Sequence, residues 1–208
     1  MAEIKTFETG TYGTNCSVIT EENKVWIVDP GADAQDIIGF LKDRALELEA
    51  VILTHAHFDH IGAIPEFEKA FPALKVYVHP SDVPMFGHPL NQNPPDYPSV
   101  GKPNSICDAG SLSGDVPFAV SVIETPGHTP GGVCYYLPDL KVLLAGDTLF
   151  AGSVGRTDLP GGDMAKLAES LKELMKLPDE TRVVPGHGPQ TTIGAERRSN
   201  PYVLQFGV

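Results

Sequence analysis

The chain has 208 residues, of which 41% are hydrophobic and 20% are charged, a balance typical of a folded globular protein. Its formal net charge of −12 argues against a nucleic-acid partner, because phosphate binding needs a dense basic surface. No apolar stretch approaches the roughly 20 residues that a membrane-spanning helix needs, and the first residues do not resemble a signal peptide. We therefore expect a single domain over residues 1–208, located in the cytoplasm, with no membrane contact. The oligomeric state is left open.

The first half of the sequence alternates between strand-like and helix-like patterns. Strands are predicted over 16–20 and 24–29, 50–53, and 75–79. Helices are predicted over 34–48 and about 64–71, the first from a stripe at Ile37, Ile38, Leu41, Ala45 and Leu48. This order is typical of a layered α/β domain.

Residues 81–110 interrupt this pattern with many prolines, and we expect them to form a long irregular loop with Met85 and Phe86 as an apolar tip. Such a loop is a candidate lid over a site. The pattern then resumes, with strands predicted over 119–124, 132–137, 141–145 and 181–185, and a helix over 165–175.

The three cysteines, Cys16, Cys107 and Cys134, include no Cys-x-x-Cys pair. Because their number is odd, we expect no disulfide framework. Cys16 and Cys134 lie in strand-like runs and are expected to be small buried hydrophobic residues.

The densest group of chemically active residues is His55, His57, Asp59 and His60, directly after an apolar strand. Buried together without a metal, these side chains would carry large desolvation costs, and the alternative is a solvated polar turn. His55 and His57 are two residues apart and can face one cation. Asp59 and His60 follow where the chain turns into a helix and can face a second cation, at the roughly 3.5–4 Å spacing of paired metals.

Three further potential ligands lie in turns bounded by Gly or Pro, either between two predicted strands or directly after one. They are His128 in Pro-Gly-His-Thr-Pro, Asp147 in Gly-Asp-Thr, and His187 in Pro-Gly-His-Gly. In such turns the backbone can approach closely, and side chains can converge on one edge of the sheets. Together with residues 55–60 they predict a binuclear metal site.

This combination of His-x-His-x-Asp-His with single His, Asp and His residues at strand ends resembles the metallo-β-lactamase fold superfamily, from about Thr14 to His187. The resemblance implies a four-layer αββα sandwich. It also implies that one metal is held by His55, His57 and His128, the other by Asp59, His60 and His187, and that Asp147 bridges them. We expect two divalent ions, zinc in the first place, with iron and manganese as alternatives.

Within the superfamily, Thr-Pro-Gly-His128-Thr and Gly-Asp147-Thr-Leu-Phe are similar to glyoxalase II, the hydroxyacylglutathione hydrolases. The resemblance implies thioester hydrolysis of substrates like S-D-lactoylglutathione by a metal-bridging hydroxide, with Asp59 both binding a metal and orienting that hydroxide. True β-lactamases of the superfamily lack the bridging Asp, so Asp147 argues against antibiotic hydrolysis as the main role. A small-molecule acyl thioester or ester is therefore the expected partner.

Substrate-binding residues are less defined by the pattern. Arg156 corresponds to a basic residue that contacts glutathione in glyoxalase II, and its alternative role is an ion pair with Asp158 or Asp163. The tyrosine of glutathione-specific members is Asp158 here, and we expect no C-terminal helical glutathione-binding domain after residue 208. A short glyoxalase II-like member has this organisation. Asp29, at the end of a predicted strand, is a candidate hydrogen-bond partner for a ligating imidazole or a turn residue.

Other functions compatible with these motifs form the alternatives. A mononuclear iron persulfide dioxygenase of the same superfamily shares Gly-Arg156-Thr-Asp, but tends to have Ala-His-Asp where this chain has Gly-His187-Gly. A lactonase or another ester hydrolase would use the same site. A non-catalytic binding module would be expected to lack ligands, and all seven positions are filled.

Overall fold

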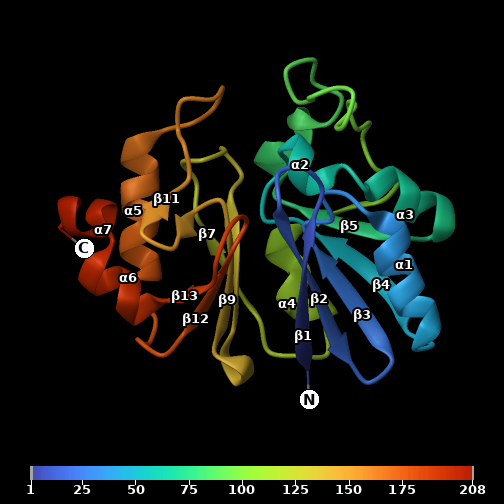
Figure 1. The fold of residues 1–208 in the computed structure, drawn as a ribbon, viewed down its shortest axis with the longest axis horizontal. Coiled ribbons are helices and arrows are strands. Elements are labelled where there is room, and N and C mark those ends of the chain that lie inside the picture. Colours follow the sequence, from blue (N-terminus) through green and yellow to red (C-terminus); the bar gives the residue numbers. More distant parts are fainter. Residues whose placement is uncertain (1, 208) are drawn as a thin grey trace.

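The computed structural model describes residues 2–207 as two β-sheets stacked face to face, with helices on both outer faces (Figure 1). The first sheet contains, in spatial order, β1 (Glu3–Thr9), β2 (Thr14–Glu21), β3 (Lys24–Val28), β4 (Glu47–Ile52), β5 (Lys75–Val78) and β6 (Ile106–Asp108). The second contains β13 (Thr191–Thr192), β12 (Arg182–Pro185), β9 (Val142–Gly146), β8 (Val133–Leu137) and β7 (Ser121–Glu124). A separate hairpin joins β10 (Leu149–Phe150) and β11 (Ser153–Val154).

Helices surround the sheets and fill the connections. The α-helices are α1 (Ala34–Asp43), α2 (Phe58–Ile61), α3 (Ile64–Ala70), α4 (Leu112–Asp115), α5 (Met164–Leu174), α6 (Ile193–Ser199) and α7 (Pro201–Gln205). Short 3₁₀ turns are η1 (Pro80–Met85), η2 (Ala109–Ser111) and η3 (Pro138–Leu140). None of the helices within residues 2–207 has both the length and the apolar character to cross a bilayer.

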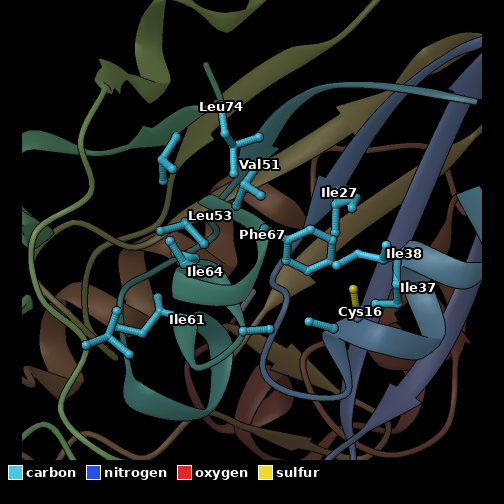
Figure 2. Packing of buried hydrophobic residues seen from close by; sticks show 14 of the residues in the cluster. Cys16, Ile27, Ile37, Ile38, Val51, Leu53, Ile61, Ile64, Phe67 and Leu74 are labelled. Carbon is cyan, nitrogen blue, oxygen red and sulfur yellow. The ribbon is translucent and has the colours of Figure 1, made fainter. Parts of the chain in front are cut away.

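Successive side chains along each strand point to opposite faces of the sheet, and this alternation explains the layers. In β3, Val25 and Ile27 face a hydrophobic core under α1 and α3, while Trp26 and Val28 face the other sheet. Figure 2 shows this core under α1 and α3, which we call the outer core. In it, Ile27 lies near Ile37 of α1 and Phe67 of α3.

The second sheet repeats this division on the other side of the molecule. In β9, Val142 and Leu144 belong to the core between the sheets, whereas Leu143 and Ala145 pack with α5. The expected four-layer arrangement of helix, sheet, sheet and helix is therefore present.

The predicted helix over 34–48 is too long. The helix α1 ends at Asp43, because Ala45 adopts a left-handed backbone with φ of 52°. The backbone N–H of Leu46 then bonds to the carbonyl of Leu41, which closes the helix and redirects the chain into β4. Leu48, predicted on the helical stripe, is a strand residue.

The predicted irregular loop over 81–110 contains more order than expected. It includes most of η1, and β6 lies parallel to β5 through the pairing of Tyr77 with Cys107. Phe86, predicted at an exposed apolar tip, is 9% exposed and belongs to the outer core. The exposed apolar residue of this segment is Leu90, at 73%.

The remaining predicted elements agree with the structure. The hairpin of β2 and β3, the helices α3 and α5, and the strands β5, β7, β8, β9 and β12 all lie where the pattern indicates, with ends shifted by a few residues. All three cysteines are free thiols, and Cys16 and Cys134 are buried. No prediction covered β1, α4, β10, β11, β13, α6 or α7.

Candidate metal centre

The seven predicted ligands lie at one end of the two sheets, at the edge where Figure 1 shows α2. The first sheet contributes four of them, His55 and His57 in the loop after β4, and Asp59 and His60 in α2. The second sheet contributes the other three: His128 lies between β7 and β8, Asp147 directly follows β9, and His187 follows β12. Because β9 and β12 run parallel, their carboxyl ends meet at the same edge.

These side chains form two groups of potential ligands. His55, His57 and His128 each offer a ligand atom within 4.8 Å of the others, and Nδ1 of His57 lies 2.8 Å from Nε2 of His128. Asp59, His60 and His187 form the second group.

Asp147 lies between the two groups. Its Oδ2 is 3.4 Å from Nε2 of His128 in the first group, and its Oδ1 is 3.4 Å from Nε2 of His60 in the second. One carboxylate therefore faces both groups, as a bridging ligand requires.

The outward ring nitrogens of the imidazoles have partners of their own. Nδ1 of His128 donates to the carbonyl oxygen of Arg156 at 2.7 Å, and Nδ1 of His187 donates to the carbonyl oxygen of Tyr12 at 3.0 Å. Nδ1 of His55 lies 3.1 Å from the hydroxyl of Thr54. Such contacts fix the tautomer and leave Nε2 directed into the centre.

For Asp29 the sequence left two roles open, a hydrogen-bond partner of a ligating imidazole or a turn residue. Its Oδ2 lies 3.1 Å from Nδ1 of His60 and accepts a 2.6 Å hydrogen bond from the Thr54 hydroxyl, while its Oδ1 accepts from the Thr54 backbone. Asp29 with His55 and His60 also forms a third potential ligand group. Since the Asp29 carboxylate contacts the outer nitrogen of His60 and is engaged by Thr54, we interpret it as the partner of a ligand.

The electrostatics divide the ligands. Burial lowers the pKa of His60 and His187, but the neighbouring carboxylates outweigh it and raise the pKa of both imidazoles. At His55, His57 and Asp147 the pKa shifts favour the protonation states that metal ligands need. Burial and the neighbouring imidazoles lower the pKa of His57 to about 3 and hold the pKa of His55 well below its usual range. Burial opposes ionisation of Asp147, but the adjacent His60 outweighs it and lowers the pKa of that carboxyl. Neutral imidazoles beside ionised carboxylates are the forms that bind divalent metals.

The residues present fit a pair of cations. Nε2 of His55 and Oδ1 of Asp147 are buried atoms with no hydrogen-bond partner among the described residues, as expected of atoms that face a metal. Gly186 allows the loop of His187 to approach, since a Cβ there would meet Oδ1 of Asp147 at 2.0 Å. The donor set of imidazoles and carboxylates suits zinc or iron.

Sequence reasoning missed Asp82, which is fully buried at η1. Its carboxylate accepts hydrogen bonds from the backbone of Ala56 at 3.2 Å, the hydroxyl of Thr129 at 2.8 Å and the backbone of Gly131 at 2.7 Å. Ala56 separates His55 from His57, so Asp82 joins the two loops that supply the first group. No motif in the sequence marks it.

Arg156 lies outside the cluster with an exposed side chain. Its guanidinium forms two hydrogen bonds with Asp158, at 2.7 and 2.8 Å, which is one of the ion pairs considered above. Asp163, the other candidate partner, caps the N-terminus of α5 instead by accepting from the backbone of Ala165 and Lys166.

Comparisons with known proteins agree with this geometry. The family model described as the metallo-beta-lactamase superfamily matches residues 9–187, and the chain belongs to that superfamily. Hydroxyacylglutathione hydrolase GloC of Haemophilus influenzae is 34% identical, over 91% of this chain and 92% of that protein.

Two solved structures are also similar over nearly their whole length. BLEG-1, described as a B3 metallo-beta-lactamase, is 37% identical with a TM-score of 0.85, covering 97% of this chain and 99% of that one. TTHA1623 in a di-iron-bound form is 38% identical with a TM-score of 0.85, covering 95% and 99%. This chain therefore shares its fold with both structures and belongs to a superfamily of metallohydrolases.

Proposed function

We propose that the protein is a binuclear metallohydrolase that cleaves acyl thioesters. The position of Asp147 carries this proposal, because its two oxygens face one imidazole from each ligand group at 3.4 Å. A carboxylate shared in this way suits two cations held side by side.

We assign the ligands as the resemblance implies. One ion is held by His55, His57 and His128, the other by Asp59, His60 and His187, and Asp147 contacts both. Two divalent ions, zinc or iron, would supply a nucleophile formed from water at neutral pH and stabilise charge on the carbonyl oxygen. The di-iron form of TTHA1623 supports a two-ion site and makes iron an alternative to zinc.

The chain's own residues orient the reaction. Oδ2 of Asp59 lies 3.2 Å from Nε2 of His187 and 3.9 Å from Nε2 of His60, so this carboxylate borders the second ion site. From there Asp59 can orient the attacking water and accept its proton. Burial raises the pKa of Asp59, but His60 and His187 outweigh it and keep the carboxyl ionised.

S-D-lactoylglutathione is the first substrate to test, because a relative at 34% identity is named a hydroxyacylglutathione hydrolase. Arg156 is the proposed contact for a substrate carboxylate or carbonyl, which would exchange with Asp158 for the guanidinium. The experiment combines metal counting on purified protein with hydrolysis of S-D-lactoylglutathione, a simple lactone and a phosphodiester. Two ions per chain and thioester turnover are expected. One iron per chain with oxygen uptake on glutathione persulfide would instead establish the dioxygenase alternative.

β-Lactam hydrolysis is a second candidate, favoured by the similarity to BLEG-1. Asp147 argues against it as the main activity, because true β-lactamases of the superfamily lack the bridging Asp. A chromogenic cephalosporin in the same panel separates the two, since the proposal expects kcat/KM to be higher for the thioester than for the β-lactam.

A further inference from the structure

A cavity of about 270 Å³ lies beside the first ligand group. Its lining includes His57 and Phe58 next to the first ligand group, Met85 and Leu90 from the segment after β5, and Leu159 and Pro160 from the segment after β11. Because His57 is both a proposed ligand and a wall residue, a group in this cavity would adjoin the reacting centre.

The lining is chemically one-sided. Leucine, methionine, proline and phenylalanine make up most of it, and no Lys, Arg, Asp or Glu occurs among the described residues that line it. Its polar members are His57, Ser81, His88 and Asn91. The guanidinium of Arg156 lies outside this lining and is engaged by Asp158. A charged group placed among these apolar side chains would lose hydration without gaining a carboxylate, ammonium or guanidinium partner in the lining.

Asn91 ties two parts of the lining together. The Asn91 amide donates to the carbonyl oxygens of Ala56 and Met85, at 2.8 and 3.1 Å, and its oxygen accepts from the backbone of Phe58 at 3.0 Å. Asn91 is 7% exposed, so these bonds are shielded from water. A pocket held in this way costs little to organise on binding.

The Phe58 ring also packs in a cluster of aromatic side chains. Its ring lies 5.4 Å from the rings of Tyr12 and Tyr97, and the two tyrosines contact each other at the same distance. The residue after His57 therefore presents a fixed apolar surface next to the metal centre, whereas Leu90, also in the lining, is 73% exposed.

We propose that this cavity binds an uncharged, apolar part of the substrate next to the scissile bond. This inference rests on the proposed function and narrows its substrate class: the preferred thioester carries an aliphatic or aromatic group, and the charged ends of glutathione do not lie in this cavity. Burial of each additional methylene should then improve binding by about fourfold until the cavity is full.

Binding can be measured without turnover. Straight-chain carboxylates from acetate to hexanoate are titrated by calorimetry into metal-loaded protein, with the carboxylate as the common group and the alkyl chain as the variable. We expect affinity to rise about fourfold per methylene. Affinity that does not depend on chain length, or no binding by any member, would overturn the proposal.

Kinetics then distinguish which side of the thioester lies in the cavity. One series varies the acyl chain on a fixed neutral thiol, and the other varies the alkyl thiol on a fixed acetyl group. A rise in kcat/KM along one series identifies the occupant, and a flat response in both contradicts the cavity's role. Carboxylate affinity that rises with length in the absence of any thioester turnover would instead refute the proposed function and leave the apolar site intact.

Variants localise the effect. Leu90→Ser and Leu159→Ser remove apolar surface from two walls, and Leu204→Ser is the matched control, since Leu204 is a 55% exposed leucine on α7. The two wall variants should flatten the carboxylate series with acetate affinity and metal content unchanged, and the control should not. Equal losses for acetate and hexanoate would show that the walls do not recognise the chain.

Discussion

The carboxylate of Asp82 accepts a 2.8 Å hydrogen bond from the hydroxyl of Thr129, the residue that follows His128. The same carboxylate accepts from the backbone of Ala56, between His55 and His57. Two loops that are far apart in the sequence are thus held in register by one buried group, and the first ligand set depends on that register.

Asp82→Asn tests this connection with little change in volume. Each carboxylate oxygen of Asp82 accepts from a backbone N–H, Oδ2 from Ala56 and Oδ1 from Gly131. In either orientation the amide NH₂ of asparagine would therefore face an N–H group that cannot accept from it. We expect a loss of about 1–3 kcal/mol in the free energy of unfolding, measured in urea. We also expect affinity for the ion at the first ligand group to fall by about 10–100-fold, measured by chelator competition. Asp108→Asn is the control, because its side chain only caps an exposed turn. Unchanged metal affinity in Asp82→Asn would contradict the positioning role.

Asp147→Ala should lose metal and abolish turnover, since it removes the carboxylate that faces both ligand groups. Elemental analysis after dialysis measures the metal, and thioester hydrolysis measures the rate. Asp139→Ala, at an exposed position on η3, should keep two ions and the wild-type rate. A normal rate in Asp147→Ala would rule out the binuclear mechanism.

In the metal-free protein, His57 should contribute to the pH dependence of the free energy of unfolding. The pKa of His57 is about 3 in the folded chain, against an ordinary value of 6.5, so between these values the unfolded state binds a proton that the folded state does not. Stability from this group is present above pH 6.5 and is lost as the pH falls toward 3. His57→Asn removes the contribution, so urea unfolding in the presence of a chelator should show a shallower decline than in wild type. His79→Asn, outside the ligand groups, should follow the wild-type curve, and parallel curves for His57→Asn would contradict the assignment.

Thiol labelling should separate the three cysteines. Burial raises the pKa of Cys134 to about 11 and raises that of Cys16 further still, whereas Cys107 is only half-buried. Folded protein at pH 8 should therefore react with iodoacetamide at Cys107 first, as read by mass spectrometry of peptides. Cys107→Ser should then resist labelling until urea is added. Comparable labelling of Cys134 in the folded protein would be inconsistent with this environment.

Arg156→Ala examines the proposed substrate contact separately from folding. The Arg156 side chain is exposed and pairs only with neighbouring Asp158, so stability and metal content should not change. KM for S-D-lactoylglutathione should rise about tenfold, with kcat retained, if the guanidinium binds a substrate carboxylate. Lys172→Ala removes a comparable exposed cation from α5 and should leave KM unaltered. An unaltered KM in Arg156→Ala would assign Arg156 to its ion pair alone.

Much of the fold could be read from the sequence, because strand periodicity is a local signal. The dense imidazole motifs likewise predicted the seven residues that the fold brings into one cluster. The end of α1 could not be read from the sequence, since Ala45 has no compositional sign of its left-handed conformation. Asp82 could not either, because its partners lie 26 to 49 residues away and only the tertiary fold brings them together. The cavity wall at Leu90 likewise depends on the path of a proline-rich segment whose pairing with β5 has no periodic pattern.

Each of the two groups assigned to an ion draws members from both sheets: His55 and His57 with His128, and Asp59 and His60 with His187. A bound cation would therefore act as a cross-link between two halves of the chain, in addition to their apolar core and to hydrogen bonds such as that from the Tyr135 hydroxyl to the Leu53 carbonyl. Neither half contains a complete binding site, so metal affinity reports on whether the two sheets are correctly assembled. Amide hydrogen exchange should slow when metal is added in the strands whose side chains form the core between the sheets, including at positions far from any ligand.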